Sequence, residues 1–302
     1  MGARLRCLVH TRPLRFEDPS VEVVNADLTR AEDCRRAVEG VDIVFMCAAN
    51  TAGAAVMAST PLVQVTPNIL MNSQLLEAAY RAGVKKFVFL SSSAAYPPSG
   101  DRPVEEREMF QGDPYDVYFA VGWMKRYTEV LCRMYSEKIT PRMPCVVVRP
   151  SNLFGPYDKY DPRTSHMMAA LIRRAVERQN PYVVWGTGED VRDMIYVDDF
   201  IDGLLLAAEK IHSFEPVNIA SGRGVSIREI IKIILEEDGF TDTEVRFDAS
   251  KPSMAPVRLI DTRKAECLLG FKSGTDLRKG IGKTLQWYRQ ASADLAVLAC
   301  KP

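Results

Sequence analysis

The fold is decided by the run Asp42-Ile-Val-Phe-Met-Cys47, the helical stretch Asn68–Ala82 that follows it, and the run Phe87-Val-Phe-Leu90. Both runs have strand length, are mostly apolar and contain β-branched or aromatic residues, as strands buried on both faces do. The stretch between them places its apolar residues at helical spacing, and Gly83 supplies a stop signal directly after it. A buried strand, a helix and a second buried strand in this order predict a parallel sheet covered by helices.

The same alternation continues on either side of this unit. The other elements predicted in the first half are the strands Leu5–Val9, Val21–Asn25 and Cys145–Val148 and the helices Arg30–Glu39 and Asp116–Glu137. We therefore predict an α/β fold built on a doubly wound parallel sheet. Ligands of such sheets bind at the carboxyl ends of the strands, so the residues that follow each strand are the first candidates for a functional site.

The second half is less regular and predicts a smaller α+β unit. Its expected elements are the strands Tyr182–Trp185 and Glu244–Phe247, the helices Thr164–Arg178, Asp199–Lys210, Ile227–Glu236 and Leu277–Tyr288, and a loose tail over Ala291–Pro302. We expect a first domain over residues 1–155 and a second over 156–302, with about 191–212 returning to the sheet of the first.

Composition excludes several classes of protein. The 302-residue chain has 39 Lys and Arg and 39 Asp and Glu residues, so its formal net charge is zero, which argues against general nucleic-acid binding. No apolar run reaches the roughly 18 residues needed to cross a bilayer. The seven cysteines are odd in number and form no Cys-x-x-Cys pair. This pattern is typical of reduced thiols in a cytoplasmic protein and predicts neither a disulfide framework nor a metal site.

Several strings, taken together, carry a resemblance to a known family. They are Asn25-Ala-Asp27-Leu28, Val44-Phe-Met-Cys47-Ala48-Ala49, Phe87-Val-Phe-Leu-Ser-Ser-Ser93, Gly122-Trp-Met-Lys125-Arg, Val148-Arg-Pro150-Ser-Asn152-Leu-Phe-Gly-Pro156 and Val191-Arg192-Asp193-Met-Ile-Tyr-Val-Asp-Asp199. In order and spacing they resemble the extended short-chain dehydrogenase/reductase family, the NAD-dependent epimerases and dehydratases of nucleotide sugars. The run from Asp161 through His166 is similar to the GDP-fucose synthase branch. The resemblance covers about residues 4–290.

This resemblance implies a Rossmann-like dinucleotide-binding domain over 1–155, a substrate-binding domain over 156–302, an NAD(P) cofactor and a nucleoside-diphosphate sugar as substrate. It places catalytic roles on Ser92, Lys125 and His166. The binding residues it implies are Arg12, Asp27, Leu28, Cys47, Ala48, Ala49, Asn68, Lys125 and Pro150 for the cofactor and Asn152, Arg192 and Arg258 for the substrate. A cation near the end of the first strand suits a 2′-phosphate, so Arg12 favours NADP.

The resemblance also implies a homodimer, formed through the helix that carries Lys125. Phe119, Trp123 and Tyr127 on that helix are large enough to be buried in such an interface, although they could equally belong to the core.

Most of these residues also have a plainer structural explanation. The alternatives are a capping serine at Ser92, a solvated lysine at Lys125, a polar helix start at His166, a turn aspartate at Asp27, a surface arginine at Arg12 and an ion pair of Arg192 with Asp193 or Asp198. These alternatives remain open at the level of sequence.

One departure from the family concerns the cofactor loop. The family begins with a strand and a Gly-x-x-Gly-x-x-Gly turn that runs into a helix and holds the pyrophosphate. Nothing here matches that unit, and Leu5–Val9 aligns with the family's second strand. The strands Leu5–Val9 and Asp42–Cys47 must therefore either pair directly or leave N–H and C=O groups unpaired. We expect a fragment or a mis-started reading frame; a natural cofactor-free variant is the other explanation.

A second departure concerns proton transfer. The family uses a Tyr-x-x-x-Lys pair on one helix face, and the position four residues before Lys125 is Val121, which cannot transfer a proton. A water, Tyr118 or His166 would have to replace the tyrosine. Two functional hypotheses follow: an NAD(P)-dependent epimerase, reductase or dehydratase of a nucleotide sugar, or a non-catalytic, degenerate sugar-nucleotide binder.

Overall fold

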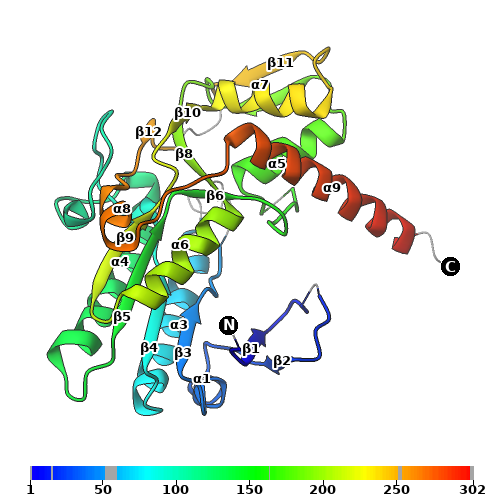
Figure 1. Cartoon of the computed structure of the whole chain (residues 1–302). Helices are drawn as coiled ribbons and strands as arrows, with labels where there is room; N and C mark the ends of the chain where they lie inside the picture. Colours follow the sequence, from blue (N-terminus) through cyan, green and yellow to red (C-terminus); the bar gives the residue numbers. More distant parts are fainter. Residues whose placement is uncertain (1, 15, 52–59, 163, 251–253, 300–302) are drawn as a thin grey trace.

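The main sheet has four parallel strands in the order β3-β4-β5-β9 (Figure 1). The computed structural model describes residues 2–14, 16–51, 60–162, 164–250 and 254–299, with side chains as far as Ser292. The strands of this sheet are β3 (Ile43–Met46), β4 (Lys86–Leu90), β5 (Cys145–Pro150) and β9 (Glu215–Ile219). The predicted α/β fold with a parallel sheet is confirmed.

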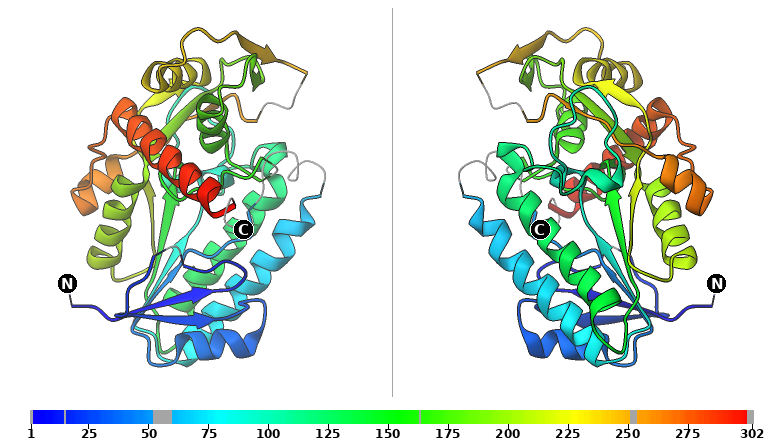
Figure 2. Two further views of the ribbon diagram at one scale, coloured as in Figure 1. Left: turned by 90° about the vertical axis from the view of Figure 1, so that its right-hand side faces the viewer. Right: turned by 90° about the vertical axis from the view of Figure 1, so that its left-hand side faces the viewer.

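Helices cover both faces of this sheet (Figure 2). Because side chains alternate along a strand, Phe87 and Phe89 of β4 pack with Leu75 on one face, while Val88 packs with Leu204 on the other. The helices of the first layer are α1 (Ala31–Val38), α3 (Leu62–Arg81) and α4 (Phe119–Arg133), and those of the second are α6 (Val197–Lys210) and α8 (Arg263–Leu269).

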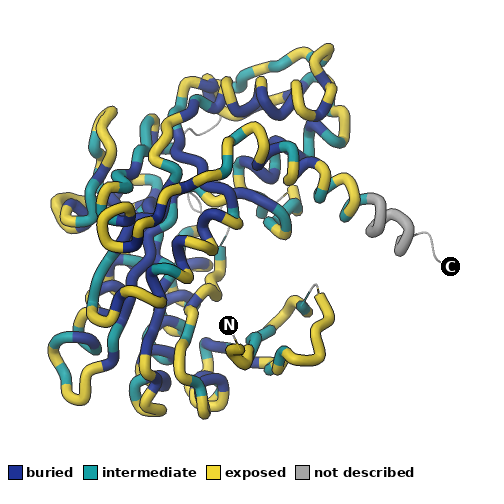
Figure 3. The backbone as a smooth tube through the Cα atoms, viewed as in Figure 1, coloured by how far each residue is buried: buried dark blue, intermediate teal, exposed yellow. Residues whose placement is uncertain are grey.

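A separate two-stranded parallel sheet is formed by β1 (Leu5–Val9) and β2 (Val21–Asn25). Without the family's first strand, β1 and β3 are expected either to pair directly or to leave unpaired edges. Within the described residues β1 pairs only with β2 and β3 only with β4, so the unpaired edges are confirmed. The pair is attached through α1, which packs against α3. In Figure 3, β1 and β2 are half-buried or exposed, whereas β4 and β5 are buried almost throughout. Leu5 is 57% exposed and Ile43 is 43% exposed.

The second half builds another core. Its strands form the order β10-β8-β12, with β6 also paired to β8, and a separate parallel pair of β7 and β11. The strands are β6 (Asn152–Phe154), β7 (Tyr182–Trp185), β8 (Val191–Tyr196), β10 (Gly224–Ser226), β11 (Val245–Asp248) and β12 (Val257–Arg258), and the helices are α5 (Met167–Val176), α7 (Ile227–Asp238) and α9 (Leu277–Ala299). The proposed domain boundary at 155/156 stays a prediction.

Two element predictions need correction. The helix expected from Asn68 starts at Leu62, and Pro67 lies inside it. Pro67 has no N–H for the carbonyl of Val63, and the side chain of Asn50 donates to that oxygen instead (3.1 Å), so the helix tolerates the proline. The loose tail predicted over Ala291–Pro302 is wrong as far as Ala299, because α9 continues to that residue through residues that favour helices; 300–302 lie outside the described residues.

Candidate functional site

The carboxyl ends of β3, β4 and β5 lie along one edge of the main sheet, because these strands are parallel. Cys47, Ala48 and Ala49 follow β3 and are exposed, Ser92 follows β4 and is half-buried, and Pro150 ends β5. Among the described residues, the small side chains directly after β3 are exposed at this edge. In parallel α/β sheets, ligands such as dinucleotides bind across the carboxyl ends of several strands.

Lys125 reaches this edge from α4. Its Nζ donates a hydrogen bond to the backbone oxygen of Leu90 (2.7 Å) and lies 4.8 Å from the centre of the Phe89 ring. Burial lowers the pKa of Lys125 to about 8, while the nearby Glu129 and Cys47 act in the opposite direction. Lys125 is therefore not a freely solvated surface lysine. Its ammonium group can exchange a proton close to neutral pH.

Ser92 caps a short turn at the end of β4. Its Oγ accepts a hydrogen bond from the backbone N–H of Ala94 (3.1 Å), which is the capping arrangement considered in the sequence analysis. The hydroxyl hydrogen of Ser92 is still available for donation to a substrate oxygen. Capping and substrate binding are therefore compatible for this residue.

A buried polar network beneath Ser92 and Lys125 was missed by sequence reasoning. Glu129 accepts hydrogen bonds from Ser91 (2.5 Å) and from two nitrogens of Arg149 (2.5 and 3.1 Å). Arg149 also donates to the hydroxyl of Tyr96 (2.9 Å), which donates to Asn218 (2.6 Å). The network joins β4, α4, β5 and β9. The sequence feature that hints at this network is the position of Glu129, one helical turn after Lys125 on the same predicted helix.

The position of the family's tyrosine is occupied by half-buried Val121. Tyr118 is buried at the start of α4, in the 3-10 turn Asp116–Tyr118. Its ring lies under the guanidinium of Arg258, 4.9 Å from the ring centre to Cζ, and its hydroxyl influences the pKa of Arg192. Tyr118 therefore faces the arginines of the second half of the chain.

The three residues expected to bind substrate do come together. Arg258 donates to the side-chain oxygen of Asn152 (2.8 Å), and Arg258 is close enough to Arg192 for the two charges to repel. Burial, with a smaller contribution from Arg258, lowers the pKa of Arg192. The guanidinium of Arg192 is held by Asp190 (3.0 Å) and by two backbone oxygens, so its ion pair is with Asp190, not with Asp193 or Asp198.

Arg258 differs from Arg192 in one respect. Its Nε and Nη1 atoms are buried and have no hydrogen-bond partner within the described part of the chain. Buried polar atoms are rarely left unsatisfied in folded proteins, because each costs about 1–3 kcal/mol. These two nitrogens therefore point to an acceptor that the described residues do not supply.

Three expected cofactor residues have local structural partners. The carboxylate of Asp27 accepts from the backbone N–H and the hydroxyl of Thr29 (3.0 and 2.7 Å), and these bonds lower the pKa of Asp27. Leu28 is a core residue, 6% exposed. Asn68 exchanges hydrogen bonds with the backbone of Asn50 (both 2.9 Å) and so fixes the loop after β3 to α3. Their cofactor roles stay predictions.

His166 and Arg12 lie near the loop that follows β6. The imidazole of His166, at the start of α5, is 2.9 Å from a carboxylate oxygen of Asp158. Arg12 is exposed after β1, and its charge acts on Lys159 of this loop. Lys159 was not singled out by the sequence, because it lies just before the run that begins at Asp161.

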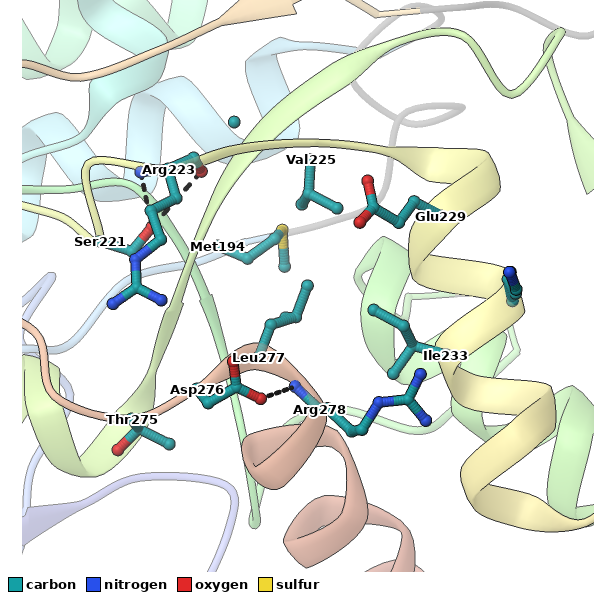
Figure 4. A pocket seen from close by; sticks show the side chains of 12 residues that line it. Met194, Ser221, Arg223, Val225, Glu229, Ile233, Thr275, Asp276, Leu277 and Arg278 are labelled. Atoms are coloured by element: carbon teal, nitrogen blue, oxygen red, sulfur yellow. Dashed lines mark hydrogen bonds between the residues drawn. The ribbon is translucent and has the colours of Figure 1, made fainter.

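A cavity of about 390 Å³ lies apart from the predicted site residues, none of which lines it (Figure 4). Met194, Val225, Ile233 and Leu277 form its apolar surface. Arg278 at its edge is held by Glu236 and Glu237 (2.6 and 2.8 Å). This cation at the cavity's edge thus already has its counter-charges.

A parallel sheet between helical layers, with a half-buried lysine at its carboxyl edge, defines an α/β protein of the kind that binds ligands at its strand ends. Residues 4–220 match the model of the NAD dependent epimerase/dehydratase family, and the chain belongs to this family. No helix in the described ranges has the length and apolarity of a membrane span.

Curated relatives agree with this assignment, and a solved structure shares the fold. The chain is 32% identical to the probable GDP-L-fucose synthase 1 of Oryza sativa subsp. japonica, over 87% of this chain and 81% of that protein. It is 30% identical to the GDP-L-fucose synthase of Sinorhizobium fredii, over 94% and 92% of the two chains. The fold is similar to that of Thermotoga maritima UDP-glucose 4-epimerase with UDP-glucose (TM-score 0.84, 24% identity, 94% and 91% covered).

Proposed function

We propose that this protein binds a nucleoside-diphosphate sugar, GDP-linked in preference to UDP-linked, and modifies the sugar with NAD(P). The observation that carries the proposal is the pair of buried, unpartnered nitrogens of Arg258 beside Asn152 and Tyr118. A planar guanidinium matches the oxygens of a diphosphate. The preference for GDP rests on the GDP-L-fucose synthase relatives.

The dinucleotide, when bound, supplies or accepts a hydride. The residues that would hold it are Cys47, Ala48 and Ala49 after β3 and Lys125 at the same sheet edge; the three residues after β3 are exposed, which suits such a ligand. Ser92 would donate its hydroxyl hydrogen to a sugar oxygen, and Lys125 would hold the ribose and keep a positive charge near that oxygen. The 2′-phosphate-bearing NADP is favoured by the exposed Arg12.

Binding of GDP-sugars tests the part of this proposal that concerns the substrate. Arg258→Met should lower the affinity for GDP-mannose or GDP-fucose by about 10- to 100-fold, because hydrogen bonds to charged groups contribute roughly 1.5–3 kcal/mol. Isothermal titration calorimetry measures this directly. Arg246→Met is the matched control, since Arg246 is exposed on β11 and pairs with Glu244 (2.8 Å). Equal affinity of Arg258→Met and wild type would contradict the proposed site.

The second candidate function, binding without turnover, is favoured by Val121. Valine at this position leaves Ser92 and Lys125 without the family's proton donor. Turnover of GDP-linked sugars with NADPH or NADH, followed by product chromatography, distinguishes the two functions. Activity in the wild-type chain that is lost in Ser92→Ala supports the enzyme. Activity that emerges only in Val121→Tyr supports the binder.

We also propose a cytoplasmic homodimer. The support is a set of exposed apolar side chains on two helices that pack side by side, α3 and α4. The largest of these are Leu62, Val63 and Leu70 on α3 and Phe119, Trp123, Tyr127 and Val130 on α4. Exposed apolar side chains gathered on neighbouring helices are typical of protein interfaces.

A further inference from the structure

Asp193 is a buried carboxylate in the middle of the small sheet that carries the predicted substrate arginines. It is 0% exposed and lies on β8, which pairs with β10, β12 and β6. Arg192 precedes it on the same strand, and Arg258 lies opposite Arg192 on β12. A buried charge is costly unless hydrogen bonds compensate it, so the donors around Asp193 determine what this residue does.

Three donors of one turn hold the Asp193 carboxylate. They are the backbone N–H groups of Ser221 and Gly222 (3.0 and 2.8 Å) and the hydroxyl of Ser221 (2.9 Å). The same Ser221 oxygen accepts from the N–H of Arg223 (3.2 Å; Figure 4). Gly222 has a φ of +73°, a conformation that favours glycine. The carboxylate thus ties the turn that leads into β10 to the neighbouring strand β8.

The backbone of Asp193 connects this turn to the substrate residues. Its carbonyl oxygen accepts from the side-chain amide of Asn152 (2.9 Å), and the side-chain oxygen of Asn152 accepts from Nη2 of Arg258 (2.8 Å). Asn152 therefore holds Arg258 by one nitrogen and leaves Nε and Nη1, the two buried nitrogens without a partner within the described ranges. Because a guanidinium is planar, holding one nitrogen limits the directions in which the other two can donate.

We propose that Asp193 is a positioning residue, which sets the direction of the Arg258 guanidinium through the 221–222 turn, β8 and Asn152. The inference rests on the substrate part of the proposed function. The Asp193 carboxylate is fully buried and has its donors in the turn, so it acts on a ligand only through Arg258. Loosening the turn should weaken ligand binding without removing any group that contacts the ligand.

Calorimetric titration of Asp193→Asn with GDP-mannose tests this role. The amide nitrogen cannot accept from the N–H groups of the turn, so the affinity should fall about 3- to 10-fold, the effect of roughly one neutral hydrogen bond.

Asp199→Asn is the matched control. Asp199 lies on α6 and is also buried, and its carboxylate has a nearly identical set of donors. These are the hydroxyls of Ser273 and Thr275 (both 2.5 Å) and the N–H of Thr275 (2.8 Å). Because the 273–275 segment carries no predicted substrate residue, the affinity of Asp199→Asn should stay within twofold of wild type.

A milder pair of variants tests the same role if the aspartate variants fail to fold. Ser221→Ala removes the hydroxyl donor of Asp193 and should also lower the affinity for GDP-mannose. Ser273→Ala removes the matching donor of Asp199 and should leave it unchanged.

The effect should pass through Arg258. In the Arg258→Met background, Ser221→Ala should cause no further loss, because the guanidinium that the turn orients is absent. An equal loss in both backgrounds would indicate a purely structural role and overturn the inference, as would unchanged affinity in Asp193→Asn and Ser221→Ala. If Arg258→Met weakens binding and these two variants do not, the substrate site stands and only the positioning role fails. A wild-type chain that binds no GDP-mannose overturns both proposals.

Discussion

Lys125 illustrates how the environment of a single side chain sets its chemistry. Its amine lies against the ring of Phe89 and has one backbone acceptor, the oxygen of Leu90. Desolvation disfavours the charged form, and Glu129 one turn away opposes that effect. The result is an amine that can hold or release a proton at physiological pH. A solvated lysine, with a pKa near 10.4, would remain charged.

The titration of Lys125 can be observed directly. After reductive methylation with ¹³C-formaldehyde, one lysine signal should titrate near pH 8, and it should disappear in Lys125→Met. Because the unfolded chain binds this proton more tightly than the folded one, the free energy of unfolding should rise between pH 8 and about pH 10. All lysine signals titrating above pH 10 would contradict this environment. Lys85→Met is the control for signal assignment.

At the scale of elements, the buried ion pair of Glu129 and Arg149 connects α4 to the central strand β5. The side chains are 1% and 2% exposed, so neither charge is solvated. Their remaining hydrogen bonds, to Ser91, Tyr96 and the backbone oxygen of Glu106, satisfy most of the donors and acceptors. This network fixes the end of β4, and with it the turn that carries Ser92.

Removing one charge from this pair should be costly. Glu129→Gln leaves the guanidinium of Arg149 buried without a counter-charge, which typically costs about 3–5 kcal/mol. Urea denaturation monitored by circular dichroism measures the change. Glu137→Gln is the control, because its pair with Arg133 (2.9 Å) is solvated and contributes about 0.3–0.5 kcal/mol. A difference of less than ~1 kcal/mol between the two variants would contradict the structural role of the pair.

The elements of the first half could be predicted because local patterns determine them. The strand Leu5–Val9 has the same bounds in sequence and structure, and that at Phe87 differs by one residue. The network of Glu129, Arg149 and Tyr96 could not be predicted, because its partners meet only after β4, β5 and α4 have packed. The substrate residues Asn152, Arg192 and Arg258 were named through the family resemblance. Only the structure shows that Arg192 is held by Asp190, whereas the Nε and Nη1 atoms of Arg258 have no partner among the described residues.

At the scale of the whole molecule, the strands are divided into units of very unequal burial. The central strands β4 and β5 of the main sheet are enclosed between two helical layers. The β7–β11 pair also has only two strands, yet Tyr182 and Val184 are buried in a core with α5 and α7. The β1–β2 pair has no comparable cover, since Val23 is 52% exposed and Leu5 is 57% exposed.

Local opening of the β1–β2 pair should therefore require much less free energy than opening of the main sheet. Hydrogen–deuterium exchange followed by mass spectrometry should show amides of residues 5–9 exchanging at least ~100-fold faster than those of 145–150. The β7–β11 pair is the internal control and should remain protected. Equal exchange rates for residues 5–9 and 182–185 would contradict this explanation. They would mean that the small number of strands, and not the lack of covering helices, determines how easily a strand pair opens. A ligand that contacts the residues directly after β1 would slow exchange at 5–9 and so report its own binding.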